Sequence, residues 1–156
     1  MKKIMFALAA ASALPWVPSA SAQVPAQIEI ETVQPISGDW TYRAIAGGSE
    51  ADFIDASAVV RLQIKCTRSN RLVSIIRTGV PAAAPTLSIW TTALSRTVPA
   101  RFLATKELVA DLASTDPLLD SIAFSRGRFA TAASGAPMVA VPSAPETTRV
   151  IEDCRS

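Results

Sequence analysis

The chain has 156 residues, of which 49% are hydrophobic and 18% charged, with 15 Lys and Arg against 13 Asp and Glu. It contains no histidine, which removes the commonest general base, the usual zinc or copper ligand and the ordinary Ser-His-Asp triad. The small net charge of +2 gives no bulk electrostatic reason to expect a nucleic acid partner.

Residues 1–22 have the pattern of a secretory signal peptide. Lys2 and Lys3 form a basic start, residues 4–14 an apolar run, and residues 20–22 a small-residue cleavage site. The apolar run is too short to span a bilayer, so we expect no stable membrane anchor. Cleavage near Ala22 would remove two lysines, leave a formally neutral chain and place it in the periplasm or outside the cell.

Residues 23–37 are predicted to be an extended N-terminal arm, with IEIET at residues 28–32 as a candidate edge strand. A single globular domain is expected from residue 38 to residue 156. In GDWTYRAI, strand periodicity places Trp40 and Tyr42 on one face. Together with Trp90 they could line a sugar or peptide groove, although an aromatic residue on a strand, Trp40 above all, is more typical of a core.

A hairpin is predicted for VVRLQIKCT and LVSIIRT, which flank the polar turn RSNR. Alternation directs Leu62, Ile64 and Cys66 inward, and Arg61 and Lys65 outward. No acid occurs between Asp55 and Glu107, where the charged residues are Arg61, Lys65, Arg68, Arg71, Arg77, Arg96, Arg101 and Lys106. The strands therefore predict a basic outer face for an anionic partner, and the alternative is a solvated face protected by cations.

The next segments predict a loop at residues 79–85 and strands at residues 86–92 and 95–99. For residues 106–113 the periodicity allows either a helix or a strand. A short helix is expected after Ser114, capped by Ser114 or Thr115, with Pro117 in its first turn.

The C-terminal segment predicts two further strands, in RGRFATA and MVAVP, and then a helix. Residues 143–146 (SAPE) read as a capping box, and Val150, Ile151 and Cys154 share one face of the helix. Cys66 and Cys154 are the two cysteines of the chain, and both are predicted to face inward in an exported protein. We therefore predict a Cys66–Cys154 disulfide rather than a pair of free thiols.

Two arginines on a predicted strand are candidate residues for binding an anion. Arg126 and Arg128 would share one strand face and could hold an anion with two guanidinium groups, while Gly127 would allow close approach. Carboxylates at i, i+4 spacing form two pairs, Glu107/Asp111 and Asp116/Asp120, that could serve as acid and base, although helix capping explains Asp116 equally well.

Four blocks, GDWTY, RLQIKC, DPLLDSIAFSRGRFA and VIEDCR, resemble a family of small exported proteins from sphingomonad-type alphaproteobacteria. The resemblance covers most of the chain after the signal peptide. It implies a bacterial envelope or secreted setting and one compact domain, and it implies no activity, ligand or catalytic residue.

The expected fold is α+β and mainly β, with antiparallel strands in a sandwich or curved sheet, a short internal helix and a disulfide-linked C-terminal helix. The expected function is that of an exported, non-enzymatic binding module without cofactor or metal site. It would use Arg126, Arg128, Arg61 and Lys65 against an anionic envelope component or a protein partner. The alternative is an inhibitor or accessory subunit of a secreted enzyme, with the loop at residues 79–85 as its contact.

Overall fold

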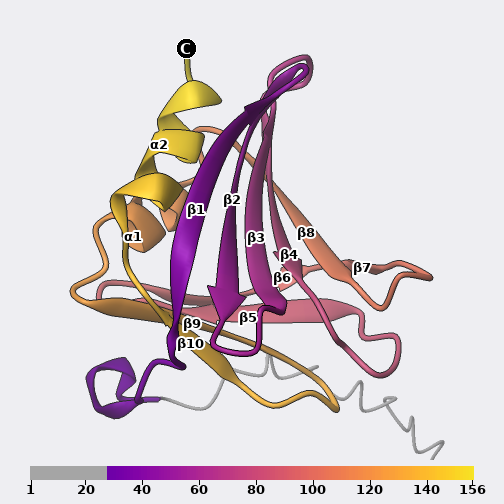
Figure 1. Ribbon diagram of the computed structural model, residues 1–156, viewed down its shortest axis with the longest axis vertical. Coiled ribbons are helices and arrows are strands. Elements are labelled where there is room, and N and C mark those ends of the chain that lie inside the picture. Colours follow the sequence, from indigo (N-terminus) through magenta and orange to yellow (C-terminus); the bar gives the residue numbers. More distant parts are fainter. Residues whose placement is uncertain (1–27) are drawn as a thin grey trace, which may run out of the picture.

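The structure is a computed structural model that describes residues 28–156, so the predicted signal peptide and the start of the arm lie outside it. The described part consists of two antiparallel sheets and two α-helices, which confirms the mainly β, α+β prediction (Figure 1). No helix within residues 28–156 has the length and apolar character needed to cross a membrane.

The larger sheet has six strands in the order β1-β2-β3-β4-β8-β7. Their bounds are β1 (Gly38–Ile45), β2 (Gly48–Asp55), β3 (Val60–Thr67), β4 (Leu72–Arg77), β7 (Arg101–Phe102) and β8 (Leu108–Ala113). Residues 108–113 therefore form a strand, one of the two structures that periodicity allowed. Pairing with β4 buries Leu108, Ala110 and Leu112 on the inner face.

The smaller sheet has four strands in the order β10-β9-β5-β6. Their bounds are β5 (Thr86–Trp90), β6 (Ser95–Pro99), β9 (Arg128–Ala133) and β10 (Val139–Pro142). Its strands run crosswise to those of the larger sheet and close one end of that sheet's inner face (Figure 1). The core between the layers includes Trp40, whose ring centroid lies 5.5 Å from Phe53 and 6.1 Å from Phe129. Trp40 is thus a core residue, which is the more typical place for an aromatic residue on a strand.

Two short helices cover the remaining part of the inner face. Helix α1 (Pro117–Ala123) is capped by Asp116, which accepts the Leu118 N–H, and not by Ser114 or Thr115. Helix α2 (Pro145–Asp153) has Ala144 as its N-cap, so the predicted capping box is wrong. The physical reason is that Pro145 occupies the first helical position, where its ring suits the backbone.

The predicted disulfide between Cys66 and Cys154 is confirmed, with the two Cα atoms 5.4 Å apart. It joins β3 to the end of α2. Next to it, the Tyr42 hydroxyl donates to Asp153 at 2.7 Å, and the Arg149 guanidinium lies 4.1 Å from the centre of the Tyr42 ring. These contacts hold α2 against the larger sheet at the end where the β3–β4 turn lies.

The described part of the arm forms a single 3-10 turn, η1 (Ile30–Thr32), where an edge strand was expected. The turn closes because the Thr32 N–H and hydroxyl both donate to the Glu29 carbonyl. Ile30 is buried with Trp90, Ala130 and Ala140 in a second, smaller apolar cluster. Apolar burial of one side chain thus decides the local conformation.

Candidate anion-binding site

The outer face of the larger sheet is balanced in charge and not basic as predicted. Glu50 and Asp52 of β2 lie on the same face as Lys65 of the neighbouring strand β3. Arg43 forms ion pairs with both carboxylates, and Lys65 Nζ lies 4.0 Å from Glu50. The acids precede the acid-free stretch in the sequence, but strand pairing brings Glu50 next to Lys65 of that stretch.

Arg126 and Arg128 do not form the predicted strand clamp. Arg126 and Gly127 lie in the loop before β9, and Gly127 has a φ of +75°, so the alternation of a strand does not extend to them. The Arg128 guanidinium donates to the Val33 carbonyl of the arm and is half-buried. Arg128 therefore fastens the arm, while the Arg126 side chain is exposed.

The two candidate carboxylate pairs also have separate partners. Asp116 accepts two hydrogen bonds of 2.7 Å from Arg96, and Asp120 lies 2.7 Å from Arg155. The other pair is not helical, because residues 108–113 form β8. Neither arrangement brings two carboxylates together across a space for a substrate.

Arg77 is the residue that the sequence reasoning missed as a site. Strand β4 alternates so that Val73, Ile75 and Arg77 face the core, and Arg77 stands opposite Leu62 of β3. Only 3% of Arg77 is exposed. The pattern LVSIIR held the necessary signal, since the residue two positions after an inward isoleucine also faces inward.

The guanidinium of Arg77 has backbone carbonyls as its partners. Nη1 donates to the carbonyls of Arg61 at 3.1 Å and Thr78 at 2.6 Å, and Nη2 donates to the carbonyl of Pro137 at 3.3 Å. Nε is buried without a partner among the described residues, and no carboxylate of residues 28–156 pairs with this cation. A buried charge of this kind normally has an opposite charge beside it.

A β-bulge brings Arg61 to the same place. The register between β2 and β3 shifts between Phe53 and Ile54, so Arg61 has no partner across the ladder. Bulges turn side chains out of the regular alternation. The Arg61 Nε lies 2.5 Å from Asp55, which also accepts the N–H groups of Ser57 and Val59 in the β2–β3 turn.

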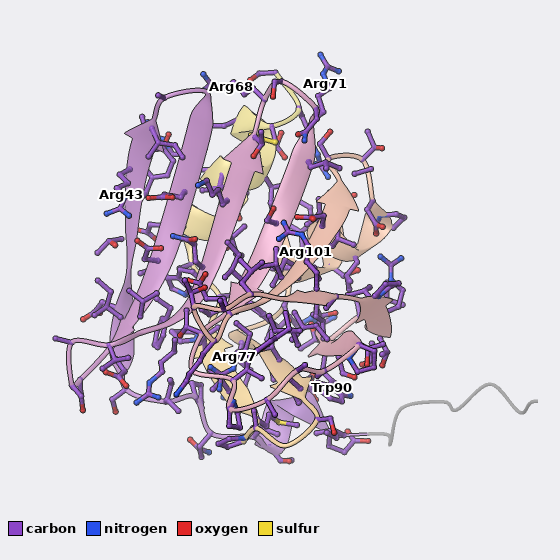
Figure 2. All side chains as sticks on the ribbon, turned by 90° about the vertical axis from the view of Figure 1, so that its right-hand side faces the viewer. Arg43, Arg68, Arg71, Arg77, Trp90 and Arg101 are labelled. Carbon is purple, nitrogen blue, oxygen red and sulfur yellow. A yellow bond between two sulfur atoms is a disulfide. The ribbon has the colours of Figure 1, made fainter. Side chains whose placement is uncertain are left out.

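These groups line a cavity of about 340 Å³ at the end of the larger sheet remote from the disulfide. Its polar side chains come from Arg77, Arg61, Asp55, Ser37 and Ser57, and its other lining residues are Ile36, Ala56, Pro137, Met138 and Val139. Figure 2 shows Arg77 at one end of the β3–β4 hairpin, while Arg68 and Arg71 mark the turn at the other end. The size falls within the usual range for small-molecule sites.

Electrostatics favour an anion in this cavity. Burial lowers the pKa of Arg77 to about 10, and the charge of Arg61 acts in the same direction. Hydrogen bonds from the Val59 N–H and from Arg61 lower the pKa of Asp55, which is therefore ionised at neutral pH. Two cations and one anion leave the cavity with a net charge of about +1, and the more deeply buried cation is the one that no described residue pairs with ionically.

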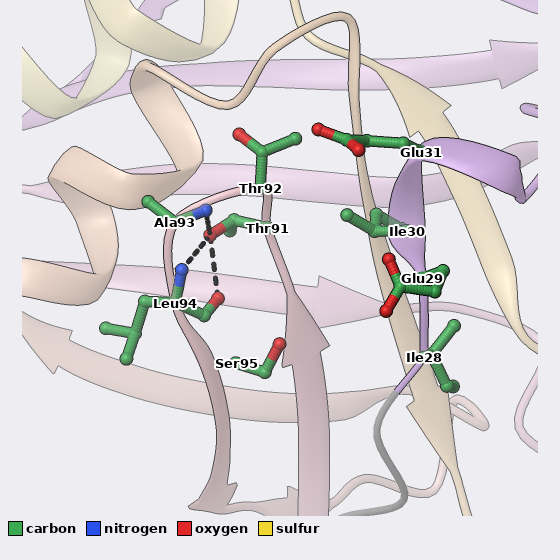
Figure 3. Close-up of a pocket in the computed structure, with 9 residues that line it drawn as sticks. All are labelled: Ile28, Glu29, Ile30, Glu31, Thr91, Thr92, Ala93, Leu94 and Ser95. Atoms are coloured by element: carbon green, nitrogen blue, oxygen red, sulfur yellow. Dashed lines mark hydrogen bonds between the residues drawn. The ribbon is translucent and has the colours of Figure 1, made fainter.

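A second cleft, of about 370 Å³, lies between residues 28–31 and the β5–β6 turn (Figure 3). Thr91 accepts the N–H groups of Ala93 and Leu94 and donates to the Leu94 carbonyl, so its polar groups are satisfied within the turn. The carboxylates of Glu29 and Glu31 belong to exposed residues. This cleft has no buried charge, and the Arg77 cavity is the stronger candidate.

Residues 28–156 contain no cluster of three or more Cys, Asp or Glu side chains placed to hold a metal ion. No protein-family model, curated protein or solved structure matches the chain.

Proposed function

We propose that this protein is an exported, non-enzymatic binding module that holds an anionic ligand in the Arg77 cavity. The proposal keeps the anionic partner expected from the sequence and moves the site from the strand face to the end of the sheet. Of the four residues first considered, Arg61 is the one that belongs to this cavity.

The observation that carries the proposal is the buried guanidinium of Arg77. Removing a charge from water is costly, and three carbonyl dipoles offset that cost less fully than an anion would. The Arg77 Nε–H has no acceptor among the described residues, and a second guanidinium lines the same cavity. An anion in the cavity would supply the missing negative charge.

Two features support an exported protein. A disulfide that joins residues 88 positions apart is typical of chains that fold in an oxidising compartment. The basic, apolar and small-residue segments of residues 1–22 have the order of a secretory signal. An envelope or extracellular binding module is consistent with both.

The test is thermal unfolding of the mature protein with and without sulfate, phosphate and carboxylate anions at constant ionic strength. A ligand that binds only the folded state raises the unfolding temperature with its concentration. We expect such a rise for the wild type and for Lys65→Gln, which changes a cation outside the cavity. The rise should be absent in Arg77→Met, and equal rises in all three proteins would refute the site.

An inhibitor or accessory subunit is the second candidate, and the exposure of Phe124 favours it. Phe124 is 75% exposed, next to the exposed Arg126 and at the end of α1. Exposed aromatic and arginine side chains are the types enriched where proteins bind one another. The loop at residues 79–85, the other candidate contact, exposes residues 81–83 and is anchored to the domain by the buried Val80 and Ala84.

Cross-linking in cells followed by mass spectrometry separates the two candidates. One stoichiometric protein partner, lost in Phe124→Ser, would support the inhibitor or accessory subunit. If the protein is recovered without a cross-linked protein partner, the small anionic ligand is the better proposal.

A further inference from the structure

The chemistry of the Arg77 cavity narrows the class of ligand, and this inference rests on the proposed function above. Two of the three guanidinium nitrogens of Arg77 donate hydrogen bonds to backbone carbonyls. Nη1 serves two carbonyls and Nη2 serves one, which leaves one N–H on Nη2 for a ligand, while Nε is buried away from solvent. The charged guanidinium can donate this N–H to a carboxylate oxygen.

The charge of the cavity matches a single negative charge. Arg77 and Arg61 contribute two positive charges, and Asp55 contributes one negative charge. A monoanion would make the cavity neutral, whereas a phosphate dianion would leave excess negative charge beside Asp55. Because opposite charges must balance where water is scarce, the monoanion is the better match.

The rest of the lining is mostly apolar. Ile36, Met138 and Val139 come from two segments that converge at the cavity, the end of the arm and the start of β10. The Ile36 N–H donates to the Ala140 carbonyl at 2.9 Å, so these two segments are held together. Besides the three charged groups, Ser37 and Ser57 are the polar side chains that line the cavity. A ligand body with many hydroxyl or amide groups would find few partners here.

We infer that the Arg77 cavity binds an amphiphilic monocarboxylate, with its carboxylate on Arg77 and its apolar body against Ile36, Met138 and Val139. The source of this chemistry is either a free aliphatic acid or the C-terminal carboxylate of a peptide that ends in an apolar residue. The peptide would bring amide groups that the apolar wall does not match, so the free acid should bind more tightly.

The experiment is calorimetric titration of the mature protein with a matched series of probes. Octanoate tests the whole ligand, acetate lacks the apolar body, octanamide lacks the charge, and inorganic phosphate tests a different anion. We expect octanoate to bind at least tenfold more tightly than acetate or octanamide. Each CH₂ added between butanoate and octanoate should tighten binding by up to about fourfold, until the cavity is filled. N-acetyl-leucine represents the peptide terminus and should bind more weakly than octanoate.

Two variants locate the binding. Arg77→Met should weaken octanoate binding at least tenfold, and Val139→Thr should weaken it through the apolar body while leaving acetate binding unchanged. Lys65→Gln serves as the control with wild-type affinity.

Phosphate binding that equals octanoate binding and depends on Arg77 would overturn the carboxylate inference and keep the anion site. Absence of Arg77-dependent binding for every probe would overturn both. Tighter binding of N-acetyl-leucine than of octanoate would overturn the preference for a free acid.

Discussion

The two ends of the β3–β4 hairpin differ in the residue that faces the core and in how closely that residue is packed. At the turn end, Cys66 is bonded to Cys154, and α2 covers the inner face of the sheet. At the other end, Arg77 occupies the inward position, and a cavity replaces the close packing. Both Cys66 and Arg77 face the core, so alternation alone does not distinguish them.

Near the turn end, Asp153 lies close to charges of opposite sign. Burial alone would raise the pKa of Asp153, but its hydrogen bond with Tyr42 and the nearby Arg68 and Arg149 charges lower the pKa overall. At the cavity end, Arg77 has three carbonyls and, within residues 28–156, no carboxylate as partner. The difference shows that the turn end contributes to stability, and it is the reason why we propose a ligand at the cavity end.

Removal of the disulfide should produce the largest change in stability. In the chain-entropy treatment, releasing a crosslink between residues 88 apart lowers the free energy of unfolding by about 4 to 5 kcal/mol. We expect this loss for the double variant Cys66→Ser/Cys154→Ser, measured by urea unfolding. Because the cavity lies at the opposite end, the folded fraction should keep the wild-type anion affinity. Loss of that affinity at a temperature where the variant is folded would contradict the independence of the two ends.

Arg77→Met should have the opposite profile. We expect anion affinity to fall about 10- to 100-fold, the range for loss of charge-assisted hydrogen bonds at a desolvated site. The change in stability should be small by comparison, because removing the desolvation cost of the cation offsets the three lost carbonyl contacts. Anion titration and urea unfolding of the same preparation measure the two effects. Arg77→Lys keeps the positive charge but has no guanidinium, so it should bind the anion more tightly than Arg77→Met and less tightly than the wild type.

Arg61→Gln should reduce anion affinity by less, about three- to tenfold. Arg61 lines the cavity, but it already pairs with Asp55 and is partly exposed to solvent. Lys65→Gln is the matched control, because Lys65 lies on the same strand and pairs with Glu50 on the outer face. The affinity difference between the two variants should shrink at high salt. Equal effects of both variants would mean that a diffuse strand charge, and not the cavity, attracts the anion.

Asp55→Asn should change binding least and with the opposite sign, tightening an anion by about two- to fivefold at neutral pH. The same residue gives a pH dependence of stability. Its pKa is lowered in the folded state, so its contribution is present above the usual aspartate value of about 3.9 and is lost as pH falls through the folded value. The stability difference between wild type and variant should therefore fade below pH 4. Urea midpoints at pH 7 and pH 2.5 measure it, and a difference that grows on acidification would contradict the ionised Asp55.

Local patterns were sufficient for much of the fold. The alternation in RLQIKC and LVSIIR predicted the central hairpin, and two inward cysteines in a chain with no other thiol predicted the disulfide. The capping box failed because Pro145 takes the first helical position and not the second, which makes Ala144 the N-cap in place of Ser143. The IEIET segment failed as a strand because burial of Ile30 against Trp90 outweighs its local β-propensity.

The candidate site was much harder to foresee. An acid-free run of sequence predicted a basic face, but β2 places Glu50 beside Lys65 of that run and Asp52 on the same face. Arg61 was selected for its outward position, and its place in the cavity depends on the bulge opposite Phe53 and Ile54. The sequence of one segment does not show which strand will lie beside it in the sheet, so the pairing of charges between strands could not be predicted from that segment.

By itself, the sequence determined the mainly β architecture, the central hairpin and the Cys66–Cys154 bond, because side-chain alternation and cysteine count act locally or through a single possible pair. Only the tertiary structure decided that Arg77 lies in a cavity with Arg61 and Asp55, buried without an ionic partner from the described part of the chain. Four segments distant in the sequence converge there, and the cost of burying a charge depends on what all of them bring to it.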